Sequence, residues 1–560
     1  MLGLFEQKQT GVPSRAKYRL RFDMETRYQA VNRETGVLEE FSIKDLQERD
    51  AEQVFTLYAN EMSGRIALAK KGIKSESDFE SLINQAKDYA LNEGVGKIRQ
   101  KNRKRIEKEE EVARTIYNMI LGRRPPNSGD PNAAYMKISR LVQDFNFIRL
   151  MNQVGFAQFA ELGNAVQVGG VRGLIRVVPE FRAMIKRAKN GELTDPVLRD
   201  IEAFYGTGSE RMTNQMIHRI DQLETNSPYG RGILDGAQRG VDRAKRITAD
   251  ISGMAPITLG LERGTSRIVM QTLADMVFSN KSLSLKRMRS LGLGDDEAKL
   301  VFKYFKKHAK LEDSYLFKTK KLREINLEEW GKTAEGAQAR DILGIAVARW
   351  TRRAVQQNDV GNLSLFMTKE YGKLLVQFRT FMVVSHAKQL LHNLKMNDMR
   401  GYQAMMYSSL TAGLAYTAQQ QIQMIGLSEK EKRKRREERL TPLEIAKASF
   451  ARSSYAAFIP GAVDSILDFY GPDSAMFSYR SSGLDSNFVT GNPSYQIVFG
   501  HLGVENTLKA VTRAGLNPDI QMTKGRARSL ATIFPFSNAI GIQNAIKIAT
   551  EDLPERSRPN

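Results

Sequence analysis

The chain has 560 residues, a length typical of about 3–4 domains or of one long helical assembly unit. Its 85 Lys and Arg residues exceed its 63 Asp and Glu residues, and the net charge of +22 favours polyanionic partners such as nucleic acid or acidic lipid headgroups. The absence of cysteine excludes disulfides, thiolate zinc sites, iron–sulfur clusters and cysteine nucleophiles. A mean hydropathy of −0.41 excludes a polytopic membrane protein. A hydrophobic fraction of 41% excludes a mainly disordered chain.

The sequence predicts a mainly α fold, an elongated assembly of many helices with one small β-hairpin near the N-terminus. Only 16 prolines interrupt the chain, and runs of helix-forming residues are long between the breaks. The hairpin is predicted from alternating residues at 28–32 and 37–41, which flank a turn at 33–36.

Start signals for two helices follow this hairpin. Ser42 and Ser75 each stand three residues before an aspartate, a spacing typical of an N-terminal cap. We therefore expect helices from Ser42 to about Lys71 and from Ser75 onward. Gly96–Leu121 is a third predicted helix, which is long and highly charged. The linker 123–131, rich in Pro, Gly and Asn, then marks a domain boundary.

Four regions are predicted along the chain. They are an N-terminal hairpin with charged helices (1–122), a central helical domain (132–310), an apolar-rich helical region (336–470) and a C-terminal region of helix and loops (471–560). Between the second and third regions, the polar stretch Leu311–Glu335 is expected to be irregular. Ala339–Lys395 is expected to be helical.

Catalytic signatures are missing from the sequence. The five histidines form no HExxH motif and no i,i+4 pair with an acidic partner; they are His218, His308, His386, His392 and His501. The GxxxxGK[ST] phosphate loop and the Gly-x-Ser-x-Gly nucleophile elbow are also missing. We therefore expect a protein that is not an enzyme, with no catalytic residue, no cofactor site and no metal site.

The most informative segment is Gly401–Ser428, in which 28 consecutive residues carry no formal charge. A helix of that length would reach about 42 Å, more than the hydrocarbon core of a bilayer at about 30 Å. Small residues spaced four apart favour close helix packing in lipid, whereas several glutamines make the segment too polar for a constitutive span. A membrane-inserting segment and a buried helix of a soluble bundle both remain open. The candidate membrane residues are Met405, Met406, Leu410, Gly413, Leu414 and Tyr416.

Two basic runs are candidate contacts with polyanions. Glu429–Arg439 carries seven basic and four acidic residues directly after the uncharged segment, where anionic headgroups would attract it. Lys97–Lys108 holds seven basic residues in twelve, which suits salt-sensitive and sequence-independent contact with phosphates. A solvated helix face is the alternative for each run. The candidate contacts are Lys97, Arg99, Lys101, Arg103, Lys104, Arg105, Lys432, Arg433, Lys434, Arg435 and Arg436.

Two further weakly apolar segments lie in the last third of the chain. They are 446–467 and 529–546, each interrupted by a proline and each accompanied by basic residues. Together with 401–428, they suggest a protein that is soluble in one state and inserts into a membrane in another.

Several short phrases of packing residues stand between about residues 50 and 470. They are Leu57–Ala69, Asp144–Leu150, Gln153–Gln158, Glu161–Asn164, Ala348–Asn362, Leu374–Met382 and Pro460–Asp464. These phrases resemble regions of the large internal virion (DNA-ejection) proteins of short-tailed bacteriophages, most strongly at Ala348–Asn362 with Leu374–Met382. They are not catalytic signatures.

The resemblance implies a protein that is stored in the virion interior near the portal, leaves with the genome and helps to form a conduit across the host cell envelope. The partners implied are a homo-oligomeric ring, other phage ejection proteins, the portal, DNA bound without sequence preference, and the host inner membrane. The longest members of the family carry an N-terminal transglycosylase module that cleaves peptidoglycan, which this sequence does not match. Either the chain resembles only their C-terminal portion, or the cleavage activity lies on another protein.

Two alternatives of different classes accompany this interpretation. One is a soluble DNA-packaging or core scaffold protein that makes no membrane contact. The other is a peptidoglycan-degrading enzyme with an unrecognised site.

Overall fold

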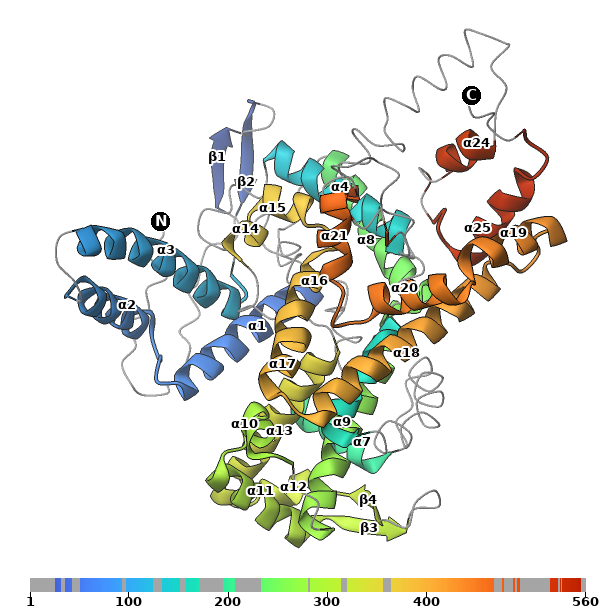
Figure 1. Cartoon of the computed structure of the whole chain (residues 1–560). Helices are drawn as coiled ribbons and strands as arrows, with labels where there is room; N and C mark the ends of the chain where they lie inside the picture. Colours follow the sequence, from blue (N-terminus) through green and yellow to red (C-terminus); the bar gives the residue numbers. More distant parts are fainter. Residues whose placement is uncertain are drawn as a thin grey trace. The chain divides into compact units, whose positions relative to one another are not determined.

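The structure is a computed structural model, and it describes residues 26–31, 36–42, 51–92, 97–123, 133–151, 158–170, 195–206, 233–279, 283–313, 320–355, 364–467, 476–477, 487–488, 491–493, 524–531, 534 and 536–554. Over these residues the protein is mainly α-helical, which confirms the predicted fold class (Figure 1). The chain divides into two compact units, Met1–Met62 and Ser63–Asn560.

The first unit contains the predicted β-hairpin. Strand β1 (Arg27–Val31) pairs antiparallel with β2 (Leu38–Ser42), with Tyr28 opposite Phe41. Gly36, at φ +68°, adopts a left-handed backbone conformation that glycine enters without steric cost. Ser42 is the last residue of β2, and the expected helix start after it lies outside the described residues.

Three helices follow in chain order and confirm the predicted pattern. They are α1 (Ala51–Lys70), α2 (Glu76–Asn92) and α3 (Lys97–Ile120). At the start of α2, Asp78 N–H donates to Ser75 Oγ at 3.2 Å and Ser75 N–H donates to Asp78 Oδ2 at 2.9 Å, which is a capping box. Hydrogen bonding of the Asp78 carboxylate by the Ser75 side chain, and then by the backbone N–H groups of Lys74 and Ser75, lowers the pKa of Asp78. The predicted linker that follows α3 lies outside the described residues from position 124 to 131.

The main hydrophobic core lies between helices of the middle of the chain. The helices that line it are α7 (Pro196–Tyr205), α9 (Met254–Phe278), α10 (Leu285–Ser290), α11 (Asp295–His308) and α13 (Ala334–Ala354). Trp330, Trp350 and Phe305 are the largest apolar side chains buried in it. The rings of Phe305 and Trp330 meet edge to face at 5.6 Å between centroids.

The stretch Leu311–Glu335 is not irregular as expected. It contains strand β3 (Lys310–Asp313), strand β4 (Lys320–Glu324) and the short helix α12 (Leu327–Trp330), and the two strands form an antiparallel pair. The prediction was wrong because four apolar residues of this polar stretch, Leu322, Ile325, Leu327 and Trp330, are fully buried in the core. The α9 side chain of Gln271 also bonds the β4 backbone, accepting from Leu322 N–H at 2.9 Å.

Helices α4 (Ala134–Leu150) and α8 (Ile233–Ile251) are joined by a buried ion pair. Lys245 Nζ lies 2.7 Å from Asp144 Oδ1, and both side chains are at least nineteen-twentieths buried. The neighbouring Gln238 amide donates to the other carboxylate oxygen, Asp144 Oδ2, at 2.5 Å. This pair links two helices that are about 100 residues apart in the sequence.

The predicted helical region Ala339–Lys395 is helical but broken into several pieces. After α13 come α14 (Leu365–Thr368), α15 (Glu370–Leu375), α16 (Thr380–Ser385), the π-helical turn η8 (His386–Leu391) and α17 (His392–Met396). Phe378 interrupts the run between α15 and α16 with a left-handed φ of +61°. A left-handed residue cannot continue a right-handed helix, so the chain changes direction there.

The last described helices build the remainder of the second unit. They are α18 (Met399–Ile422), α19 (Glu429–Arg439), α20 (Pro442–Arg452), α21 (Ile459–Leu467), α24 (Lys524–Ala531) and α25 (Ile540–Ala549). Helix α18 packs against α20 (Figure 1). It also packs against the short 3-10 helix η4 (Phe159–Ala165), which comes from much earlier in the chain.

Candidate membrane and polyanion surface

The uncharged segment forms most of α18, but the helix is shorter than the segment. Its 24 residues reach about 36 Å. Gln423 caps the helix, and Gly426 turns the backbone at φ +80°. Among the described residues, no helix combines the length and apolarity that a membrane crossing requires.

Helix α18 buries mainly small and polar side chains, together with Tyr416, and exposes most of its large apolar ones. Ala404, Ser408 and Ala412 on the inner face are almost fully buried. On the opposite face, an outer stripe of apolar residues recurs every three or four positions, as one face of a helix does. The outer stripe consists of Met399, Tyr402, Met406, Leu410 and Leu414, and each of these residues is more than half exposed.

A glycine of η4 allows the inner face of α18 to approach closely. A Cβ atom at Gly163 would stand 2.6 Å from the carbonyl carbon of Tyr407 and still closer to the backbone of Ser408. No side chain fits there without moving one of the two backbones. Gly163 belongs to the phrase Glu161–Asn164, so this phrase forms a helix contact.

Buried hydrogen bonds hold the middle of α18. Ser408 Oγ donates to the carbonyl of Ala160 at 3.1 Å and accepts from the backbone N–H of Ser454 at 3.1 Å. Ser454 Oγ in turn donates to Asn164 Oδ1 at 3.0 Å, and Asn164 Nδ2 donates to the carbonyl of Ala354 at 3.2 Å. The network fixes α18 to three distant parts of the chain through polar atoms.

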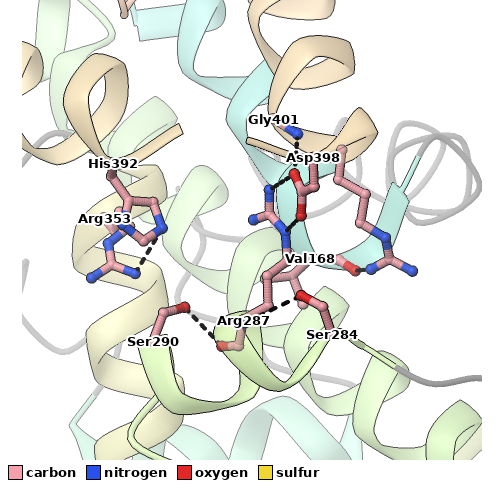
Figure 2. Close-up of polar contacts among 9 residues, drawn as sticks. Val168, Ser284, Arg287, Ser290, Arg353, His392, Asp398 and Gly401 are labelled. Carbon is pink, nitrogen blue, oxygen red and sulfur yellow. Dashed lines mark hydrogen bonds and ion pairs between the residues drawn. The ribbon is translucent and has the colours of Figure 1, made fainter. Parts of the chain in front are cut away.

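A bidentate ion pair anchors the N-terminal end of α18 (Figure 2). Nε and Nη2 of Arg287 each lie 2.6 Å from a carboxylate oxygen of Asp398, the residue that caps the helix by accepting from Gly401 N–H at 2.8 Å. The hydrogen bonds from Arg287 hold the pKa of Asp398 below its usual range. The neighbouring Arg400 donates to the carbonyl of Val168.

His392 lies beside the same anchor and contacts Arg353, with 3.3 Å between Nε2 of the imidazole and Nη1 of the guanidinium (Figure 2). A guanidinium group only donates, so the imidazole accepts at Nε2 and carries its proton on Nδ1. Burial, followed by the charges of Arg353 and Arg287, lowers the pKa of His392 from 6.5 to about 4. His392 is therefore neutral in the folded protein at pH 7.

Folding stability is expected to fall on acidification because of His392. The unfolded chain takes up a proton near pH 6.5 while the folded state resists until about pH 4, so stability is full above pH 6.5 and declines as the pH falls through that window. Allowing for solvent screening of a half-buried group, the loss is about 1–2 kcal/mol. Urea unfolding at pH 7.5 and pH 4.5 measures it, and His392→Gln is expected to lose less stability than the parent chain. Identical losses in both proteins would contradict the assignment.

Glutamines secure the C-terminal end of α18. Gln419 Oε1 accepts from Arg452 Nη1 at 2.6 Å, Gln420 Oε1 accepts from Arg435 Nε at 2.9 Å, and Gln423 Oε1 also accepts from Arg435. Burial lowers the pKa of Arg452 to about 10. These glutamines, whose polarity argues against a constitutive span, thus accept hydrogen bonds from two partly buried guanidinium groups.

The structure places the six candidate membrane residues on different faces. Met406, Leu410 and Leu414 lie on the outer stripe, and Met405 is half-buried. Gly413 is buried against Ser449 of α20. Tyr416 is buried beneath Arg452 and donates its hydroxyl to the carbonyl of Arg439 at 2.9 Å. Membrane insertion remains a prediction. Of the six candidate residues, those exposed for contact with lipid are Met406, Leu410 and Leu414 of the outer stripe.

The basic run after α18 forms α19, and its cations have different surroundings. Lys432 pairs with Glu429 at 2.7 Å and Arg433 with Glu437 at 2.9 Å, while Arg435 turns inward to the glutamines. The other two candidates, Lys434 and Arg436, are exposed. Exposed pairs of this kind contribute little to stability and leave a net positive surface.

The N-terminal basic run forms α3 and is partly neutralised by its own helix. Arg103 pairs with Glu107 at 3.7 Å, Arg105 pairs with Glu109 at 3.3 Å, and Lys104 is exposed. The side chains of the other three candidates, at 97, 99 and 101, lie outside the described part. The i,i+4 spacing of acid and base predicts such pairing directly from the sequence.

Among the described residues, no group of three or more His, Asp or Glu side chains is placed to hold a metal ion. Comparison of the chain with known protein families, with curated proteins and with solved structures finds no match.

The sequence predicts the uncharged helix but not which of its faces is turned outward. The positions 402, 406, 410 and 414 carry large apolar residues at a constant spacing of four, whereas the residues on the opposite face are small or polar. That spacing is the signal that defines the stripe. The sequence alone does not reveal that the stripe faces outward, because apolar stripes ordinarily face the core.

Proposed function

We propose that this chain is an internal virion protein of the ejection type, stored in the phage capsid near the portal and expelled with the genome. In this role it helps to form an oligomeric conduit across the host envelope and performs no catalysis. Its outer stripe on α18 meets the anionic inner membrane, while exposed cations of α3 and α19 contact polyanions such as DNA or headgroups.

The resembling phrases support the proposal through their positions in the fold. Asn146, in one phrase, donates to Gln377, in another, at 3.0 Å, and Asn164 donates to the carbonyl of Ala354 at 3.2 Å. The phrases therefore contact one another across more than 180 residues of sequence. Residues with this role specify a fold, so a resemblance at these positions favours a shared helical architecture.

The observation that carries the membrane contact is the outer stripe beside a net-positive helix. Large exposed apolar side chains in a contiguous row mark an interaction surface. The stripe ends at Leu414, and the exposed Ile425 lies in the turn between α18 and α19, whose seven basic residues exceed its four acidic ones. Apolar area and cationic charge together match an anionic bilayer surface, where each nearby Lys or Arg contributes about 1 kcal/mol.

Flotation with lipid vesicles tests this contact. The double variant Met406→Asp/Leu410→Asp removes two residues of the outer stripe, each 53% exposed, so the fold should tolerate it. We expect its affinity for anionic vesicles to fall about 100-fold or more, because each lost apolar side chain contributes about 1.5–3 kcal/mol on burial. The matched control is Leu82→Asp/Tyr89→Asp on α2, where the exposed fractions are 48% and 72%, and it should bind as the parent chain does.

Three results would separate the alternatives. Failure of the parent chain to float with anionic vesicles would favour the soluble packaging or scaffold protein. Equal binding by the stripe variant and the parent would show that another part of the chain contacts the lipid. Clearing of purified cell wall in a zymogram would establish the peptidoglycan-degrading enzyme, and we expect none.

A further inference from the structure

Three cationic side chains from different helices converge beyond the C-terminal end of α18. Arg435 comes from α19, Arg528 from α24 and Lys547 from α25. Helix α25 is held in place by Asn544, whose Nδ2 donates to the carbonyl of Ile425 at 3.0 Å. Arg528 donates from Nε to Thr550 Oγ1 at 2.9 Å and from Nη2 to the carbonyl of Lys547 at 3.4 Å.

The charges in this cluster are not balanced by its acceptors. Glu431 pairs with Arg528 at 3.5 Å. The hydrogen-bond acceptors of Arg435 are the neutral side-chain amides of Gln420 and Gln423, and the acidic groups near it are Glu431 and Glu438. The three cations thus outnumber the two carboxylates in a partly buried setting.

Lys547 is the cation that this charge imbalance affects most. Its Nζ is buried and has no hydrogen-bond partner. An ammonium group removed from water without an acceptor is unfavourable by several kcal/mol. Burial, then the charges of Arg435 and Arg528, lowers its pKa to about 8. The apo protein therefore keeps part of Lys547 neutral near pH 8.

We propose that Lys547, Arg435 and Arg528 form a binding site for one phosphate oxyanion, either free phosphate or the phosphate of a lipid headgroup. An oxyanion supplies the acceptor that Lys547 Nζ lacks and offsets the excess charge of the two guanidinium groups. The site includes no residue of the outer stripe. Phosphate binding at the site and membrane contact by the stripe are therefore tested independently.

Binding and protonation at this site are linked. An anion beside Lys547 favours the ammonium form, so binding raises the pKa of the lysine, and protonation strengthens binding in return. Affinity should therefore be high at pH 7.5 and fall by pH 9.5, even though inorganic phosphate becomes more fully dianionic as the pH rises. The other charged groups that face Lys547 are Arg435, Arg528 and Glu431, and Glu438 lies near Arg435.

Isothermal titration of the full chain tests the proposal, with inorganic phosphate in one arm and monomeric dihexanoyl phosphatidylglycerol in the other. Chloride at matched ionic strength is the reference. Binding of phosphate alone identifies a free-anion site, and tighter binding of the lipid identifies a headgroup site. Absence of binding in both arms overturns the proposal.

Variants assign the binding to the cluster. Lys547→Met should weaken binding about 10- to 100-fold, the loss expected for one charge-assisted hydrogen bond. Its melting temperature without phosphate should equal or exceed that of the parent, because a buried unpaired charge is removed. Lys332→Met, at an exposed lysine paired with Glu329, is the matched control and should bind normally. Equal affinity in Lys547→Met and the parent overturns the proposal.

Discussion

Lys245→Met is expected to lower the free energy of unfolding by about 3–5 kcal/mol, measured by urea unfolding. The substitution removes the ammonium that lies 2.7 Å from Asp144 Oδ1 and 3.6 Å from Asp242 Oδ1, so two acidic groups lose this cation. Burial already raises the pKa of Asp144 even with Lys245 present. The carboxyl must then either stay charged in an apolar setting or take up a proton, and both outcomes favour the unfolded chain.

The double variant Asp144→Asn/Lys245→Met provides the test of mechanism. It removes both charges and retains an amide oxygen for Gln238, so most of the lost stability should return. Arg433→Ala is the matched control for an exposed pair and should shift stability by less than about 1 kcal/mol. If the double variant were as unstable as Lys245→Met, the cost would come from packing and not from the orphaned charge.

Gly163→Ala is expected to destabilise the protein by about 2–3 kcal/mol, because the added methyl group would overlap the backbone of Tyr407 and Ser408. Neither backbone can yield without breaking contacts of Ser408, whose hydroxyl bonds both Ala160 and Ser454. The result is a shifted or loosened α18. Thermal unfolding measures the loss, and hydrogen exchange should show faster exchange over residues 404–416 in particular.

A second glycine gives a control of opposite sign. Gly240 lies exposed within α8, and a Cβ there would meet nothing within 4 Å. Gly240→Ala should therefore raise stability by about 0.5–1 kcal/mol, since alanine loses less backbone entropy in a helix. A Gly163→Ala protein as stable as the parent would show that η4 and α18 do not approach as closely as described.

The outer stripe of α18 shows which features of this surface the sequence pattern predicts and which it does not. The absence of charge over Gly401–Ser428 predicts a helix, and the constant spacing of its large apolar residues defines a stripe. The contacts that occupy the other face come from far away in the chain: Arg452 reaches Gln419, and Arg287 reaches Asp398 across 111 residues. Local sequence does not encode which distant arginine arrives, so the direction of the stripe depends on the assembled fold.

The polar stretch before α13 shows the same division. Its composition favours an irregular segment. However, β3 and β4 form an antiparallel pair because Leu322 of β4 is buried in the main core, which helices from other parts of the chain build. Strand formation of this kind depends on burial against neighbours more than on intrinsic preference.

The amino-acid sequence alone determined the features that rest on short-range physics. These are the helical character of the chain, the hairpin at 27–42, the capping box of Ser75 and Asp78, and the self-neutralising pairs of α3. Tertiary structure decided which face of α18 turns outward, which charges are buried in pairs, and that Lys547 meets two arginines. The reason is range: caps and i,i+4 pairs act over a few residues of one element, whereas burial and charge balance depend on every segment that folds against them.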